Sequence, residues 1–199
     1  IPKNKIITTN VWSSELSKLV SNAMLAQRIS SINSISSLCE KTGANIDEVS
    51  RAVGMDRRIG PEFLKVSLGF GGSCFKKDIL NLVYLLRYYG LTKEADFWLQ
   101  VIHINTHQTE RFGEIIFNKF KSNINNKKLS ILGWSFKKNT NDSRESASIY
   151  LSKFLLTKKF KLKIYDPMVS KKRIIKDLQD IGLQHSKLKN VEILSNLHD

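Results

Sequence analysis

The feature that most constrains the fold is a stretch from Asn10 to Thr42 that contains neither glycine nor proline. Asn10 is a residue type that caps the start of a helix, and Gly43 is one that ends a helix in the left-handed conformation. A helix of about 32 residues is roughly 48 Å long at 1.5 Å per residue. Such a helix is longer than a small domain is wide, so we expect it to extend beyond one compact unit.

The apolar residues of this stretch form more than one stripe. One stripe runs from Trp12 to Ala26 and another from Leu25 to Cys39. A helix that is apolar on two sides must be covered on two sides. Neighbouring segments of the chain cover one side, and serines between Ser30 and Ser37 would let a partner helix approach the other. We therefore expect a homodimer through residues 10–42; the alternative is that both sides pack within one chain.

Shorter helices are expected to follow. Asn45–Glu48 is typical of a capping box and opens a helix that ends at Gly54. Five of the ten glycines lie between Gly54 and Gly72, where we expect a loop. Ser73 is expected to cap a helix that ends at Gly90, and Thr92 to start another whose inward stripe includes Asn105. Residues 1–121 are thus predicted to be an α-helical domain.

The pattern changes after a polar linker at 122–128. Residues 129–133 predict a buried strand, a polar loop runs to Ser143, and a helix with Ile149 and Leu155 precedes a strand at 161–165. This order predicts a parallel βαβ unit. A helical stretch near 174–178 and a short strand at 191–194 follow. Residues 122–199 are therefore predicted to be a truncated α/β, Rossmann-like domain with a parallel sheet.

The charge is +14, and +10 of it belongs to residues 101–199. Such an excess attracts polyanions, but no zinc-finger, RNP or basic-zipper pattern accompanies the lysines. A solvated lysine-rich surface is the preferred interpretation, and nucleic-acid binding the weaker alternative. The longest apolar stretch, 79–86, is too short to cross a bilayer, and no signal peptide precedes Trp12. Two cysteines suit a reducing compartment. We expect a cytoplasmic chain without membrane, nucleic acid or metal.

The densest chemical signal is Gly69–Asp78, with the sequence GFGGSCFKKD. Cys74 falls in the first turn of the expected helix, where the helix dipole and two lysines, Lys76 and Lys77, favour the thiolate. Asp78 lies four residues further on, on the same face, where it can accept a proton from water that attacks an acyl-thiol. The alternative is a buried structural cysteine, which is the role we assign to Cys39.

Other polar residues have suitable spacing for binding. Lys18 and Asn22 are four residues apart on the long helix and suit an oxyanion, although each can be an ordinary surface residue. Cations that can meet a diphosphate lie near the glycines and after the first strand of the second domain: Arg57, Arg58, Lys65, Lys137, Lys138 and Arg144. Gly133 stands alone without G-x-G-x-x-G, so this βαβ unit lacks a standard dinucleotide site.

Several long motifs occur together and in one order. Gly69–Asp78 resembles the nucleophile loop of the UDP-glucose/GDP-mannose dehydrogenase family. The resemblance extends through Ser14–Lys18, Ala26–Asn33 and Phe136–Ser146, and it covers nearly the whole chain. The family is therefore identified by a series of motifs and not by one of them.

The resemblance implies an NAD-dependent, four-electron oxidation of UDP-glucose to UDP-glucuronate. Cys74 matches the nucleophile that captures the aldehyde, Lys18 and Asn22 match the groups around the reacting oxygen, and Asp78 matches the water-activating aspartate. The substrate contacts match Lys18, Asn22, Lys65, Gly69, Phe70, Gly71, Phe136 and Lys137. Arg58 matches an arginine that reaches the active site of a neighbouring subunit. The NAD contacts match Cys74, Lys77 and Arg144.

The resemblance also shows what the sequence lacks. The family's N-terminal domain, with its G-x-G-x-x-G and a catalytic glutamate, is absent, as is the last part of the UDP-binding domain. Asn139 stands where the family often has Asp. We therefore expect an excised piece of a dehydrogenase without turnover of its own. The alternatives are a related enzyme for GDP-mannose or UDP-N-acetylmannosamine, and a module that only dimerises.

Overall fold

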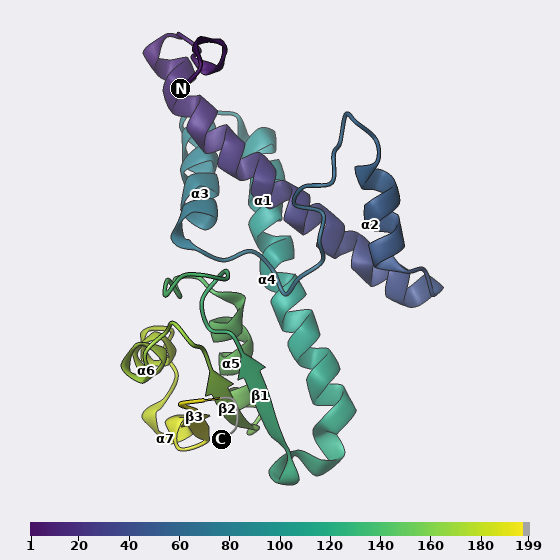
Figure 1. Ribbon diagram of the computed structural model, residues 1–199, viewed down its shortest axis with the longest axis vertical. Coiled ribbons are helices and arrows are strands. Elements are labelled where there is room, and N and C mark those ends of the chain that lie inside the picture. The colour runs from purple at the N-terminus through teal and green to yellow at the C-terminus, as the bar shows by residue number, and fades with distance from the viewer. Residues whose placement is uncertain (197–199) are drawn as a thin grey trace.

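The computed structural model describes residues 1–196, apart from the side chains of Asn125 and Asn126. After a short 3-10 turn, η1 (Lys3–Lys5), one long helix, α1 (Val11–Thr42), crosses obliquely over the other helices of this part (Figure 1). The Asn10 side chain accepts a hydrogen bond from the N–H of Ser13 at 2.8 Å, and Gly43 ends the helix with φ of 77°. The predicted single long helix is confirmed.

Three further helices pack against α1: α2 (Ile46–Gly54), α3 (Ser73–Tyr88) and α4 (Thr92–Phe120). The small side chains of Ala23 and Ala26 on α1 let α3 and α4 approach closely. The predicted cap at Ser73 is wrong. The N-cap of α3 is Gly72, with φ of 82° and no side-chain cap, because the chain turns into the helix one residue earlier.

The second part of the chain starts with a 3-10 segment, η2 (Lys121–Asn126), where the sequence predicted only a linker. It continues as β1 (Lys128–Leu132), α5 (Ala147–Thr157), β2 (Lys161–Tyr165), α6 (Lys171–Asp180), α7 (His185–Leu188) and β3 (Val191–Ile193). The strands are parallel in the order β1-β2-β3. The predicted βαβ unit and fold class are confirmed, whereas α7 was not anticipated.

The sheet packs one apolar face onto its helices. The register pairs Leu129 with Leu162 and Leu162 with Val191, so these side chains share a face. The last turns of α4 add Ile116, Phe117 and Phe120 to this core. Helix α4 therefore contributes to both apolar cores. The predicted domain boundary between residues 1–121 and 122–199 stays a prediction. Residues 197–199 lie outside the described part.

Helices α4 and α5 pack in close contact where α4 carries Gly113. A Cβ atom at this position would lie 2.6 Å from the ring of Phe154 on α5. The absence of a side chain at Gly113 therefore lets the two helices touch.

Among the described residues, no helix has the length and apolar character needed to span a membrane.

Asp166, at the end of β2, holds the carboxyl ends of the first two strands together. Its Oδ2 accepts N–H bonds from Trp134 at 2.6 Å and Ser135 at 3.0 Å, and its Oδ1 accepts them from Met168 at 2.7 Å and Val169 at 2.9 Å. Burial raises the pKa of Asp166, but the four N–H donors outweigh burial and hold the pKa below its ordinary 3.8.

The structure predicts that Asp166→Asn destabilises the chain. The amide would direct its NH2 group at backbone donors, so we expect the free energy of unfolding at neutral pH to fall by about 2 kcal/mol. Because the folded-state pKa is lowered, this contribution is present above the unfolded value and is lost as pH falls through the folded pKa. Urea denaturation should show a difference from wild type that shrinks below about pH 4.

The matched control is Asp180→Asn, which removes an exposed i,i+4 ion pair with Lys176 and should change stability by less than about 0.5 kcal/mol. A difference for Asp166→Asn that is no larger, or that does not vary with pH, would contradict this account.

Candidate functional site

Cys74 lies in the first turn of α3 and is exposed, whereas Cys39 is buried on α1. Both are free thiols. The burial of Cys39 agrees with the structural role predicted for it. Cys74, in contrast, is accessible to solvent at the start of its helix. A thiol at this end of a helix faces unpaired backbone N–H groups, which favour a negative charge.

Asp78 lies one helical turn after Cys74, and its side chain is only 2% exposed. Its Oδ2 accepts hydrogen bonds from Lys18 Nζ and, at 2.6 Å, from Asn22 Nδ2. Lys77 Nζ lies 3.8 Å from the other oxygen, Oδ1. The structure thus brings Lys18 and Asn22, which are four residues apart on α1, together with Asp78 on α3.

These contacts set the charges of the cluster. Burial raises the pKa of Asp78, but the hydrogen bonds from Lys18 and Asn22 outweigh it and hold that pKa below the ordinary range. The hydrogen bond to Asp78 raises the pKa of Lys18, and the negative charge of Cys74 adds a smaller upward contribution. At neutral pH the cluster therefore contains a carboxylate and an ammonium near Cys74.

The loop between β1 and α5 lies directly against the start of α3. The N–H of Gly72 donates to the carbonyl oxygen of Arg144 at 2.8 Å. A Cβ at Gly71 would lie 2.6 Å from the carbonyl oxygen of Glu145, and one at Gly72 would lie 2.9 Å from the ring of Phe136. The glycines of the motif are therefore needed for contact with protein backbone and an aromatic ring from the second part of the chain.

A second contact joins the same two parts. Glu145, with φ of 55°, accepts hydrogen bonds from Lys76 Nζ at 2.8 Å and from the hydroxyl of Tyr150 at 2.6 Å. Burial and the Glu145 carboxylate raise the pKa of Tyr150. Lys76 therefore forms an ion pair with Glu145. Lys77, the other lysine of the motif, is 71% exposed, and its ammonium is accessible to solvent. This contact was not predicted, because no local sequence pattern relates Glu145 or Tyr150 to Lys76.

Arg144 and Arg58 are each bound to a nearby aspartate. Arg144 donates to Asp142 at 2.7 and 2.9 Å, and the negative charge of Cys74 is a minor cause of its raised pKa, after Asp142 itself. Arg58 donates to Asp56 at 2.6 and 3.0 Å and is 89% exposed. Arg144 is thus placed beside Cys74, while Arg58 projects from the 55–72 loop.

The loop that carries Arg58 is held in shape by Arg28 of α1. This guanidinium donates to the carbonyl oxygens of Ile59, Gly60 and Glu62 at 2.7–2.8 Å. Sequence reasoning did not single out Arg28, because its role depends on backbone atoms more than 30 residues away.

The remaining predicted site residues lie in the glycine-rich segment and beyond β1. Lys65 is exposed, and Phe70 is buried against α3 with Gly69 before it. Lys137 Nζ lies 5.4 Å from the centre of the Phe136 ring. Asn105, which the sequence placed on an apolar stripe of α4, instead binds the N–H and the carbonyl oxygen of Phe70 at 2.7 and 3.1 Å.

A cavity of about 590 Å³ opens beside the start of α3. Ser73, at the helix start, lines this cavity. Four cationic side chains line it as well: Lys76, Lys77, Arg144 and Arg173. Three carboxylates also line the cavity, and two of them are paired with Lys76 and Arg173. The cations and the helix N-terminus suit a phosphate-bearing ligand. Within residues 1–196, no group of three His, Cys, Asp or Glu side chains is placed to hold a metal ion.

Family comparisons agree with this arrangement. The family model described as "UDP-glucose/GDP-mannose dehydrogenase family, central domain" matches residues 12–107, and the model for the family's UDP binding domain matches residues 130–198. The chain belongs to the UDP-glucose/GDP-mannose dehydrogenase family. The resemblance of the sequence motifs to this family is thereby confirmed.

Individual members of the family are similar over most of this chain. It is 58% identical to the UDP-glucose 6-dehydrogenase of Gallus gallus over 92% of its residues, and 55% identical to UDP-glucose 6-dehydrogenase 3 of Arabidopsis thaliana over 89%. It spans 37% of the length of each. A UDP-glucose dehydrogenase structure from Pyrobaculum islandicum matches 92% of this chain and 40% of its own, with 30% identity and a TM-score of 0.77.

The contact between Glu145 and Lys76 leads to a prediction about Tyr150. Replacing Glu145 by Gln removes the negative charge that favours the protonated phenol, so the pKa of Tyr150 should move down toward its ordinary 10.0. Loss of the charged hydrogen bond from Lys76 should also lower the free energy of unfolding by about 1 kcal/mol. Absorbance titration of tyrosine, with Tyr150→Phe to assign the signal, measures the first effect.

Glu62→Gln, in the exposed 55–72 loop, is the control and should leave the Tyr150 titration unchanged. If Glu145→Gln also leaves it unchanged, Glu145 does not contact Tyr150 in solution.

Proposed function

We propose that this chain supplies the central helical domain and part of the UDP-binding domain of an NAD-dependent UDP-glucose 6-dehydrogenase. The observation that carries the proposal is the cluster at the start of α3, in which exposed Cys74 lies one turn from a buried carboxylate held by Lys18 and Asn22. Relatives that are 55–58% identical to this chain carry the name UDP-glucose 6-dehydrogenase. The substrate is UDP-glucose and the product UDP-glucuronate.

Cys74 is the proposed nucleophile. After the C6 alcohol has been oxidised to an aldehyde, the thiolate sulfur attacks the carbonyl carbon and a C–S bond forms, which keeps the reactive aldehyde on the protein. NAD, when bound, accepts one hydride in each of the two oxidations. The second oxidation leaves a thioester on Cys74, and attack by water breaks the C–S bond and returns the thiolate.

Lys18 and Asn22 are the proposed donors to the oxygen on which negative charge develops. Because the carboxylate of Asp78 raises the pKa of Lys18, the amine stays protonated and ready to donate. Asp78 uses Oδ2 for Lys18 and Asn22. We assign Oδ1 to the proton of the water that hydrolyses the thioester.

The NAD contacts are assigned to Cys74, Lys77 and Arg144. Lys77 and Arg144 line the cavity beside the start of α3, where their charges and the helix N-terminus fit a diphosphate. Lys65, Gly69, Phe70, Gly71, Phe136 and Lys137, together with Lys18 and Asn22, are assigned to UDP-glucose. Arg58 is assigned to the site of a neighbouring subunit, and its side chain is 89% exposed.

The long helix is the proposed dimer interface. Met24, Ile35 and Leu38 of α1 remain exposed although α3 and α4 cover other faces of the helix. This exposed face also favours the second candidate function, a module that only dimerises. Preference for GDP-mannose or UDP-N-acetylmannosamine is the alternative within the family, and calorimetric titration of the full-length protein with each sugar nucleotide separates these substrates.

NADH formation tests the enzyme proposal. The full-length protein that contains this chain should produce two NADH per UDP-glucose consumed. The 199 residues alone should produce none, because they match only the family's central and UDP-binding domains. In the full-length protein, Cys74→Ala should lower NADH production by several orders of magnitude, because no thiol captures the aldehyde. Cys39→Ala, at the buried cysteine, is the control and should retain catalysis.

Unchanged turnover in Cys74→Ala would refute the covalent role. Turnover by the 199 residues alone would refute the inactivity of this chain.

Sedimentation of the 199-residue chain at micromolar concentration tests the dimer. We expect a dimer, and Leu38→Glu should shift it to monomer because a charge would be buried in the proposed interface. Leu132→Glu, at an exposed position on β1, is the matched control and should remain dimeric. A wild-type chain that sediments as a monomer would count against both dimerisation through α1 and the module alternative.

A further inference from the structure

Residues 67–70 pair with no strand of the described sheet, yet side chains of two helices bind five of their eight backbone polar groups. Asn33 Oδ1 on α1 accepts the N–H of Ser67 at 3.0 Å, and Gln108 Nε2 on α4 donates to the carbonyl oxygen of Ser67 at 3.0 Å. Thr109 Oγ1 donates to the carbonyl oxygen of Leu68 at 2.7 Å. Together with Asn105, which binds both groups of Phe70, these side chains replace the hydrogen bonds of a sheet.

The residues that bind this segment are arranged regularly. Asn105, Gln108 and Thr109 are three and four residues apart, so they share one face of α4. Asn33, Gln108 and Thr109 are all buried, and Gln108 is 5% exposed. A buried amide that lost its partner would leave polar atoms without hydrogen bonds, which is costly. The two helices therefore hold residues 67–70 in place, and within the segment Ser67 Oγ adds hydrogen bonds to Gly69.

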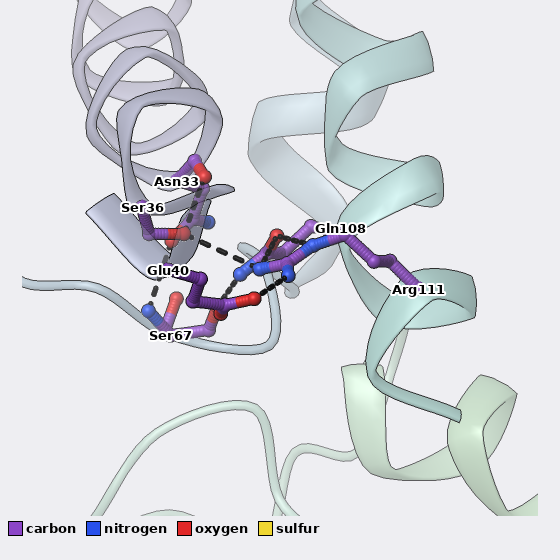
Figure 2. Close-up of polar contacts among 6 residues, drawn as sticks. All are labelled: Asn33, Ser36, Glu40, Ser67, Gln108 and Arg111. Carbon is purple, nitrogen blue, oxygen red and sulfur yellow. Dashed lines mark hydrogen bonds and ion pairs between the residues drawn. The ribbon is translucent and has the colours of Figure 1, made fainter. Parts of the chain in front are cut away.

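Arg111 determines which way the Gln108 amide faces (Figure 2). Arg111 Nη2 and Nε donate to Gln108 Oε1 at 3.1 and 3.3 Å, while Nη1 pairs with Glu40 at 2.6 Å and Nη2 also donates to Ser36 Oγ at 3.3 Å. A guanidinium only donates hydrogen bonds, so it requires the amide oxygen of Gln108 on its own side. The amide NH2 must then face the carbonyl oxygen of Ser67.

We propose that Gln108, oriented by Arg111, is a positioning residue for binding of the sugar nucleotide. It fixes Ser67, and with it the segment from Lys65 to Gly71 that carries the proposed UDP-glucose contacts, before the substrate arrives. A segment that is already ordered loses less conformational freedom on binding. This inference rests on the proposed function. Gln108 contacts neither Cys74 nor Lys18 nor Asp78, so its effect falls on substrate binding and not on the hydride or thiol steps.

The test variant is Gln108→Glu in the full-length protein. Glutamate has the same shape and still accepts from Arg111, but it has no donor for the carbonyl oxygen of Ser67 and places a negative oxygen against it. We expect the KM for UDP-glucose to rise about tenfold, the effect of one lost buried hydrogen bond, while kcat stays within about twofold.

Two further variants separate positioning from general loss of structure. Glu40→Gln removes a partner of the same guanidinium without touching residues 67–70, and its KM should stay within about twofold of wild type. Thr109→Val removes the bond to Leu68 while keeping the side-chain shape, and its KM should rise as in Gln108→Glu. Thermal unfolding of all three variants shows whether each is folded.

Hydrogen exchange in the 199-residue chain gives a readout independent of activity. Gln108→Glu should speed exchange of the amides of Ser67 and Phe70, and Glu40→Gln should not. The proposal is overturned if Gln108→Glu and Thr109→Val leave KM within twofold of Glu40→Gln, if kcat falls in place of KM, or if exchange at these amides is unchanged. If wild-type full-length protein fails to oxidise UDP-glucose, the proposed function fails, and the exchange result still decides whether Gln108 holds the segment.

Discussion

A single buried carboxylate connects the two helices on which the candidate site is built. Asp78 of α3 binds Lys18 and Asn22 of α1, and these contacts keep it ionised although it is almost fully buried. A buried charge without partners is strongly unfavourable. The contact between α1 and the Cys74 helix thus includes an interaction that also raises the pKa of Lys18. The same ion pair adds to the apolar packing of Ala23 and Ala26 on α3 and sets the charge of the site.

Besides the apolar packing of α4 on the second core, the two parts of the chain meet through a backbone contact at the start of α3. The contact needs Gly71 and Gly72, because any side chain there would collide with the 136–146 loop. It is completed by the bond from Gly72 to Arg144 and by Glu145, which binds Lys76 and Tyr150. Arg144 is thereby brought to Cys74 from a segment 70 residues later. The glycine-rich motif serves assembly of the site as well as its chemistry.

Much of the fold was predictable because its signals are local. The stretch without glycine or proline predicted α1, and strand–helix–strand order predicted the parallel sheet. Spacing of four residues correctly put Lys18 with Asn22, and Cys74 with Asp78, on shared helical faces. The contact between Lys18 and Asp78 depends on the packing of α1 on α3. The spacing of residues within one helix cannot predict such a contact between two helices.

The parts that were missed depend on contacts between distant segments. Glu145 and Arg28 act on groups that no local pattern relates to them. Asn105 and Gln108 are polar residues on an inward-facing helix surface, where the periodicity predicted only apolar packing. A buried amide on a helix is a signal that something polar lies opposite, but the sequence does not say what. The short α7 and the cap at Gly72 were not predicted for a simpler reason. An element of only a few residues is too short to show a periodic pattern of apolar residues in the sequence.

The tight crossing of α4 and α5 at Gly113 limits how the two halves of the molecule can move. Phe154 is seated where a side chain at Gly113 would be, so sliding α5 along α4 would drive this ring into the neighbouring turns. Pivoting about the crossing keeps the ring in place. Any widening of the cavity beside the start of α3 would then be a rotation about the contact between Gly113 and Phe154.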